Sequence, residues 1–248
     1  MSAAADGHDR LAVLYRDAHF VAVHKPAGMP VHRTGLSPVR EVVLQRLRDQ
    51  LHRRVYPVHR LDHATSGVLL LALSAEAARR FGELVGDGAV SKLYWAVVRG
   101  FTATAGEIDH PLVDLDSGVR RLALTRFRSL ARVELPLPVG RYATARYSLV
   151  EMEPVTGRQH QIRRHLKHIS HPVIGDTTYG KGEHNRVFRE LAGLQRLWLL
   201  ARRLRFVHPF EGTPVDVEAE PEEAWRALLG RFGWDWVLAG AGPERAGA

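Results

Sequence analysis

The segment "HRLDHATS", residues 59–66, places side chains capable of chemistry directly before an apolar run. Asp62 lies two residues after Arg60, and Thr65 follows three residues later. A carboxylate in such a turn caps the backbone, pairs with a cation, or takes part in covalent or acid–base chemistry. On these residues alone, a capping role in a hydrogen-bonded loop is the simpler interpretation.

Three features favour a catalytic interpretation instead. Arg60 shares the loop with Asp62 and can reach into the same site. The following run "GVLLLALS" is typical of a strand buried on both faces, which gives the loop a rigid support. A distant stretch, "GRQHQIRRH" at residues 157–165, offers an arginine that could keep a poorly solvated carboxylate ionised.

Tyr94 is a second candidate, in the predicted strand "SKLYWAVVRG". Alternation along that strand places Tyr94 on the face opposite Trp95. Two interpretations stay open: an ordinary core aromatic, or a ring that stacks on a nucleobase with its hydroxyl at the reacting centre.

Histidines 160, 165, 168 and 171 raise the question of a metal site. No nearby carboxylate completes a known ligand spacing, and the surrounding arginines would repel a cation. We therefore expect no metal, and histidines that are solvated or contact RNA.

The charge distribution predicts a polyanionic partner. The formal net charge is +8, and residues 158–206 hold eleven Lys and Arg against three acids, a surplus that equals the net charge of the whole chain. A second patch, Arg120 to Arg132, contains no acid, whereas the stretch 211–235 is acidic.

The remaining composition predicts a cytoplasmic protein. The chain has no cysteine, and its N-terminus has no secretory pattern. The longest apolar run, residues 68–73, is far below the ~20 residues that a membrane helix needs, so no membrane partner is expected.

Strands and helices alternate without strict βαβ order, which predicts an α+β fold on a large, mixed and mostly antiparallel sheet. The expected strands span residues 20–25, 67–73, 92–99, 143–153, 195–209 and 214–219. The expected helices span residues 38–52, 75–86, 156–168 and 222–232. Residues 101–142 are expected to be a turn-rich excursion over the surface.

Two details accompany the helix at residues 75–86. Ser74 is expected to cap it, and Phe81, Leu84 and Val85 are expected to pack inward.

Four sequence motifs of this chain resemble those of a known family. "HRLDHATSG" resembles the HRLD-x-x-TSG motif of the RluA-type pseudouridine synthases, and "TGRQHQIRRH" resembles their arginine helix. "VAVHKPAGMPVH" and "KLYWAVVRG" resemble two of their strands, in the family's order, and the likeness covers roughly residues 11–219. The resemblance implies the pseudouridine synthase catalytic fold, with an active-site cleft across the sheet. It also implies that the patch Arg120 to Arg132 is a flexible clamp on the phosphate backbone and that the acidic stretch 211–235 faces away.

The resemblance also implies a domain organisation. Residues 11–238 form one catalytic domain of two joined halves, without a separate N-terminal RNA-binding domain, and residues 1–10 and 239–248 are flexible termini. Several stretches look most similar to the branch of the family that modifies uridine 65 of tRNA.

Residue roles follow from the resemblance. Asp62 is the catalytic aspartate, which attacks the sugar, attacks the base or promotes elimination; Arg163 is its expected cationic partner, and Tyr94 packs on the uracil. Arg60 takes the place of the flipped base. The expected substrate-binding residues are Arg60, His59, Thr65, Ile162, Arg158 and Leu199. Relatives often carry histidine where this chain has Leu200, a change expected to lie outside the core chemistry and to affect how the strand holds RNA.

The resulting hypothesis is an isomerase that converts a tRNA uridine to pseudouridine by base flipping, as a monomer and without a cofactor. Three alternatives are the same reaction on ribosomal RNA, a non-catalytic RNA-binding protein, and a hydrolase that uses Asp62. The combination of Asp62, Tyr94 and Arg163 disfavours a simple binder, and the lack of a second suitable carboxylate disfavours the hydrolase.

Overall fold

The computed structural model describes residues 10–33 and 41–240. The chain divides into two compact units. Unit 1 comprises Met1–Lys92 and Ala201–Glu220, and unit 2 comprises Leu93–Leu200 and Pro221–Ala248. Each unit combines antiparallel strands with helices, so the predicted α+β class is confirmed. No helix in the described part of the chain is long and apolar enough to cross a bilayer.

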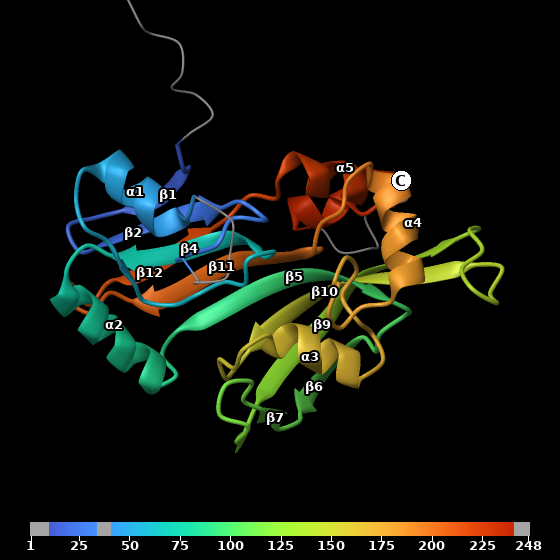
Figure 1. Ribbon diagram of the computed structural model, residues 1–248, viewed down its shortest axis with the longest axis horizontal. Coiled ribbons are helices and arrows are strands. Elements are labelled where there is room, and N and C mark those ends of the chain that lie inside the picture. Colours follow the sequence, from blue (N-terminus) through green and yellow to red (C-terminus); the bar gives the residue numbers. More distant parts are fainter. Residues whose placement is uncertain (1–9, 34–40, 241–248) are drawn as a thin grey trace, which may run out of the picture. The chain divides into compact units, whose positions relative to one another are not determined.

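Unit 1 is built on the strand order β1-β2-β4-β11, with β3 paired to β4 and β12 paired to β11. In the view of Figure 1, α1 lies above and α2 below these strands. The elements are β1 (Val13–Arg16), β2 (Phe20–Lys25), α1 (Val43–Leu51), β3 (Tyr56–Pro57), β4 (Ser66–Ala72), α2 (Ala75–Gly86), β11 (Leu199–Val207) and β12 (Pro214–Glu218).

The core of unit 1 confirms several predictions. All seven residues of β4 are buried, as expected of a strand covered on both faces. The Ser74 hydroxyl accepts a hydrogen bond from the Ala77 N–H at 3.1 Å and so caps α2. Phe81 is fully buried against Phe20, but the inward prediction for Val85 is wrong, because 39 % of that residue is exposed.

Helix α1 is shorter than predicted. It begins at Val43, because Val42 is extended, and it ends before His52, which adopts a left-handed conformation. The predicted start at Pro38 falls outside the described residues. Of the predicted flexible termini at 1–10 and 239–248, the structure describes Arg10, Ala239 and Gly240, and Ala239 is the last residue of a 3₁₀ helix.

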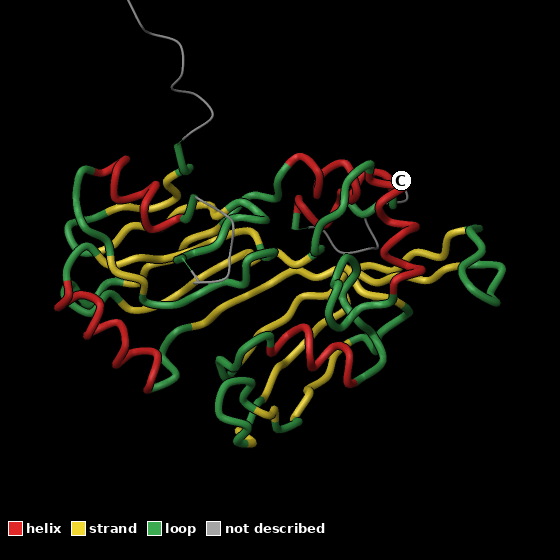
Figure 2. Tube along the Cα trace, viewed as in Figure 1, coloured by secondary structure: helices red, strands yellow, loops and turns green. Residues whose placement is uncertain are grey.

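Unit 2 is built on the antiparallel order β5-β10-β9-β6, with a separate hairpin of β7 and β8. Figure 2 shows the long strands β9 and β10 running side by side. The elements are β5 (Ser91–Arg99), β6 (Ala105–Asp109), β7 (Leu112–Val113), β8 (Arg120–Arg121), β9 (Leu124–Leu135), β10 (Ala145–Pro154), α3 (Gln161–His168), α4 (Gly182–Ala192), α5 (Glu223–Arg231) and a 3₁₀ helix at Asp235–Ala239.

The predicted surface excursion at residues 101–142 is wrong. The segment contains β9, a twelve-residue strand paired on both sides, and the flexible clamp of Arg120 to Arg132 is wrong with it. Exposed arginines alternate along β9 with less exposed residues, and the cross-strand carboxylates of Glu107 and Glu151 lie 2.7 and 2.9 Å from Arg126 and Arg128. The arginines are thus the solvated face of a strand.

Candidate active site

The loop that carries Asp62 is a tight turn at the entrance to β4. The Thr65 N–H donates to the Asp62 carbonyl at 3.1 Å, and β4 begins one residue later. Leu61 and Thr65 are buried, whereas Asp62 is half-buried and Arg60 is exposed. The Asp62 side chain is therefore carried by a short turn that is anchored by buried neighbours.

Lys25 holds this turn in place through hydrogen bonds to backbone carbonyls. It is fully buried, and its ammonium donates to the carbonyls of Pro26 at 2.9 Å, Met29 at 2.7 Å and His63 at 3.0 Å. The Gly28 N–H donates to the same His63 carbonyl at 3.0 Å. A buried ammonium is tolerated when its protons are satisfied, so these bonds hold residues 26–29 and the Asp62 turn as one piece.

The role of Lys25 was missed at the level of sequence. The available signal is a lysine at the end of the apolar segment "FVAVHK", directly before a proline. A lysine in such a position is either at the surface or has a specific set of acceptors.

His59 holds the start of the loop to β4. Its Nε2 accepts a hydrogen bond from the Leu70 N–H at 2.9 Å. Burial, with a smaller contribution from the charge of Lys92, lowers the pKa of His59 to about 3. The imidazole is therefore neutral at physiological pH and acts as a backbone acceptor. Substrate contacts from His59 and from the buried Thr65 stay predictions.

Gly67 explains the glycine of the "TSG" motif. Its φ is +109°, and a Cβ placed there would lie 2.2 Å from the carbonyl oxygen of Ala201 on β11. Only glycine permits this backbone conformation and this close approach of two backbones.

In unit 2, Gln161 locks the start of α3. Its Nε2 donates to the Leu124 carbonyl and to Thr125 Oγ1, both at 2.9 Å. Its Oε1 accepts from the Arg158 N–H at 2.9 Å and from Thr156 Oγ1 at 2.7 Å. Because residues 156–160 form this loop, the helix begins at Gln161, five residues later than predicted.

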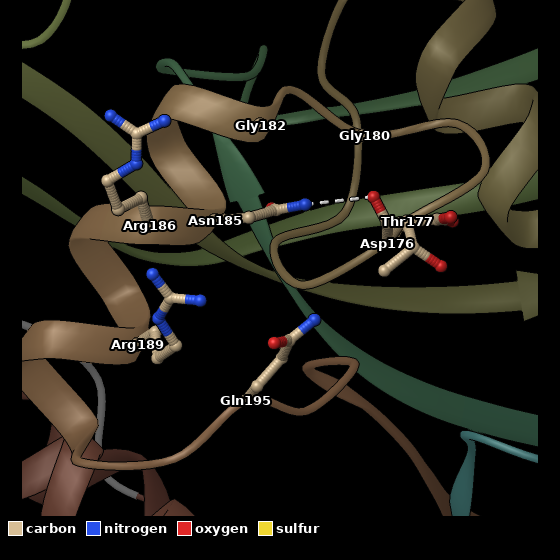
Figure 3. Close-up of a pocket in the computed structure, with 8 residues that line it drawn as sticks. All are labelled: Asp176, Thr177, Gly180, Gly182, Asn185, Arg186, Arg189 and Gln195. Carbon is tan, nitrogen blue, oxygen red and sulfur yellow. Dashed lines mark hydrogen bonds between the residues drawn. The ribbon is translucent and has the colours of Figure 1, made fainter.

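Arg163 lies inside unit 2 and pairs with Asp176. Its Nε lies 2.7 Å from Asp176 Oδ2, its Nη2 lies 2.9 Å from Oδ1, and both residues are buried. Burial raises the pKa of Asp176, but hydrogen bonds from Arg163 and from the N–H groups of Tyr179 and Thr178 outweigh it and hold that pKa below its usual value. Figure 3 shows Asn185 reaching the same loop, where its Nδ2 donates to the Asp176 carbonyl at 2.9 Å.

Asp176 was also missed by sequence reasoning. It is one of only three acids among the eleven cations of residues 158–206, and it follows the glycine in "HPVIGD". That isolation is the signal that could have identified it as the partner of a buried arginine.

The other predicted residues of unit 2 differ in exposure. Tyr94 is half-buried on β5, where it faces Met152 of β10 in the strand register. Ile162 and Leu199 are buried at 7 % and 3 % exposure. Arg158 is exposed, and its Nε donates to the Leu122 carbonyl at 3.0 Å.

Leu200, which stands where relatives often carry histidine, is fully buried in the core of unit 2 with Trp198 and Trp225. An effect of this change on how the strand holds RNA stays a prediction. The Leu200 side chain contributes to packing.

The predicted residues divide between the two compact units. In unit 1 these are His59, Arg60, Asp62 and Thr65, and in unit 2 they are Tyr94, Arg158, Ile162, Arg163 and Leu199. The pairing of Asp62 with Arg163 stays a prediction.

The expectation that the acidic stretch faces away from the cations is wrong. Arg203 and Arg205 on β11 pair with Asp216 on β12, and Arg202 lies 3.1 Å from Glu218. The cations of β11 are therefore neutralised across a hairpin. They do not add to a free positive surface.

Comparison with known proteins identifies the family. A family model described as RNA pseudouridylate synthase matches residues 19–168. A Vibrio cholerae protein named tRNA pseudouridine synthase C is 46 % identical over 239 residues, which cover 92 % of this chain and 98 % of that protein. A Salmonella typhi protein of the same name is 45 % identical, with 92 % of each chain covered.

Solved structures agree. The human RNA pseudouridylate synthase domain-containing protein 4 superposes with a TM-score of 0.70 at 25 % identity, covering 90 % of this chain and 93 % of that one. The human domain-containing protein 1 gives a TM-score of 0.68 at 26 % identity, covering 88 % and 86 %. These matches agree with the turn that carries Asp62 and with helix α3, which carries Arg163. The chain is an isomerase that belongs to the RNA pseudouridylate synthase family.

Proposed function

We propose that this chain converts a uridine of tRNA, uridine 65, to pseudouridine. The observation that carries the proposal is the match over 92 % of the chain to relatives named tRNA pseudouridine synthase C. The resemblance of its motifs to the branch acting on uridine 65 supports the position. The reaction breaks the N1–C1′ bond, forms a C5–C1′ bond and moves a proton from C5 to N1, so no oxidant, reductant or cofactor is required.

The predicted site residues of unit 1 and those of unit 2 have different roles in the proposed reaction. A uridine in a folded RNA must leave its stack to reach the reacting groups. Arg60, exposed beside the Asp62 turn, occupies the space that the base leaves. The carboxylate of Asp62 attacks the sugar, attacks the base or promotes elimination, and the rigid support from β4 and Lys25 fixes its position.

Unit 2 supplies the second group. Tyr94 packs against the uracil ring, and the apolar side chains of Ile162 and Leu199 line the same pocket. Arg163 keeps the carboxylate of Asp62 ionised. Its guanidinium plane is set by Asp176. Contacts from His59, Thr65 and Arg158 are further parts of the proposal. We expect the chain to act on tRNA as a monomer in the cytoplasm.

The test is pseudouridine mapping across total RNA from cells with and without this protein. The proposal expects loss of one tRNA signal, at position 65, and its return when the wild-type chain is supplied. Loss of a ribosomal RNA signal with tRNA unchanged would favour the ribosomal alternative. An unchanged map in both RNAs would contradict the proposal.

A further inference from the structure

Three adjoining cavities follow the loop at residues 176–181 on unit 2. The first, of about 360 Å³, lies between this loop and α4 and shares Gly180 with the second. The second, of about 410 Å³, shares Lys167 and Tyr179 with the third, of about 290 Å³. The shared lining residues make the three cavities neighbours along one surface.

Each of the three cavities is lined by at least two cationic side chains, and those of the third are Arg164 and Lys167. Figure 3 shows Arg186 and Arg189 on successive turns of α4, beside the loop that carries Asp176. Lys167 and Lys181 line the second cavity. Within the described residues no carboxylate pairs with any of the four exposed cations Lys167, Lys181, Arg186 and Arg189.

The carboxylates near the cavities do not pair with these cations. Glu183 and Glu190 are exposed on α4, line none of the three cavities, and form no ion pair with the four cations within the described residues. Asp176 is the acid in the cavity linings, and its two oxygens are engaged by Arg163 and by backbone N–H groups. A surface with unpaired cations and an internally satisfied acid attracts anions.

Arg99, which lines the second cavity, is held in place by a hydrogen bond to the buried His184. Arg99 Nε donates to His184 Nε2 at 3.1 Å, and His184 Nδ1 lies 3.0 Å from the Tyr147 hydroxyl. Because a guanidinium only donates, Nε2 must accept, so His184 is neutral and its Nδ1–H donates to Tyr147. Burial, followed by the charge of Arg99, lowers the pKa of His184 and maintains that state.

The ligand chemistry follows from these features. Hydroxyl groups of Ser170, Thr178 and Tyr179 stand beside the cations of the second cavity, a combination that suits phosphate oxygens. A single phosphate would occupy only part of one cavity. Three neighbouring cationic cavities suit a chain of phosphates.

We propose that the three cavities form one phosphate track that binds the sugar-phosphate backbone of the RNA substrate, apart from the residues assigned to the base. The proposal rests on the proposed function for the identity of the polyanion. Such contacts supply affinity and register, and leave the rate of the bound complex unchanged.

The experiment compares three double variants with the wild type. Two remove cations from the track: Lys167→Gln with Lys181→Gln, and Arg186→Gln with Arg189→Gln. The matched control, Arg79→Gln with Arg226→Gln, removes two exposed arginines that line none of the three cavities. For each protein, the dissociation constant for an unmodified tRNA transcript is measured against salt, and the single-turnover rate is measured at saturating enzyme.

The phosphate track predicts that each track variant binds the transcript roughly tenfold more weakly near 0.1 M salt. The slope of log affinity against log salt should fall by about two, one for each lost contact. The saturating rate should stay within about twofold of the wild type, and the control should keep both the affinity and the slope.

Unchanged affinity and slope in both track variants would overturn the proposal. So would a large loss of the saturating rate at unchanged affinity. If the variants kept RNA binding and lost binding to phosphatidylserine vesicles, the surface would serve a membrane instead. Failure of the proposed function is seen separately, as a wild-type chain that binds the transcript and forms no pseudouridine.

Discussion

Arg163 and Asp176 form an enclosed ion pair, with 2.7 Å between Nε and Oδ2 and 2.9 Å between Nη2 and Oδ1. Two parallel hydrogen bonds fix the plane of a guanidinium as well as its position. Asp176 also accepts two backbone N–H bonds, from Thr178 and Tyr179, at 2.9 Å each. It is therefore a positioning residue for the arginine that the proposed mechanism uses.

The pair predicts a large cost for Asp176→Asn. The substitution leaves a buried guanidinium without its counter-charge, which costs about 3–5 kcal/mol of unfolding free energy. The saturating rate should fall as well, because Arg163 loses its fixed orientation. Urea unfolding and single-turnover kinetics measure the two effects. The exposed pair of Arg126 and Glu107 provides the control, since Glu107→Gln should change stability little. Equal losses in the two variants would contradict this assignment.

Lys25 predicts a coupled loss of stability and rate. Lys25→Met keeps a similar length but removes the donor for the carbonyls of Pro26, Met29 and His63. The His63 carbonyl keeps the Gly28 N–H, but leaving the Pro26 and Met29 carbonyls without this donor costs about 1–3 kcal/mol. The loosened Asp62 turn should also lower the saturating rate, while RNA affinity changes little. A variant as stable and as fast as the wild type would show that the three bonds do not position the turn.

The fold could be predicted where the local pattern is unambiguous. The apolar run of β4 and the Ser74 cap of α2 are both in place, because a continuous hydrophobic run and a short-range hydrogen bond depend on near neighbours. β9 was missed because its arginines made a half-solvated strand look like a loop. The cross-strand acids that pair with them lie 19 and 23 residues away.

The candidate site shows the same division. Asp62, Tyr94 and Arg163 were identified by motif, since the family pattern names them directly. Lys25 and Asp176 were missed because their roles depend on contacts across 38 and 13 residues of sequence. No spacing rule predicts which buried carbonyls or which arginine such a side chain will meet.

Substitution by alanine is expected to have opposite effects on stability at Gly67 and at Gly82. Gly67→Ala places a Cβ 2.2 Å from the Ala201 carbonyl oxygen at a φ of +109°, so strands β4 and β11 must separate. The expected loss is at least about 3 kcal/mol. Gly82→Ala, on α2 with nothing within 4 Å, should stabilise by about 0.5–1 kcal/mol. Chemical unfolding of both variants measures the difference, and a neutral Gly67→Ala would disprove the close approach.

His59 predicts a pH dependence of stability. Its pKa is about 3 in the folded chain and about 6.5 when unfolded. The unfolded chain therefore binds the extra proton first. The His59 contribution is fully present above about pH 6.5 and is lost as the pH falls from there toward 3.

His59→Gln tests this window, because glutamine offers the Leu70 N–H an acceptor that does not titrate. Between pH 6 and pH 4 the unfolding free energy of the wild type should fall more steeply than that of the variant. The difference in slope should approach about 1.4 kcal/mol per pH unit, the value for one proton. Parallel curves would mean that His59 takes up its proton equally in both states.

We propose that the carboxylate of Asp62, held on its fixed turn, performs the isomerisation of a tRNA uridine. The most direct measurement is single-turnover formation of pseudouridine on a tRNA transcript by the wild type and by Asp62→Asn, with the dissociation constant of each. We expect no detectable product from Asp62→Asn at an affinity within a few fold of the wild type. Product formation by Asp62→Asn at the wild-type rate would contradict it.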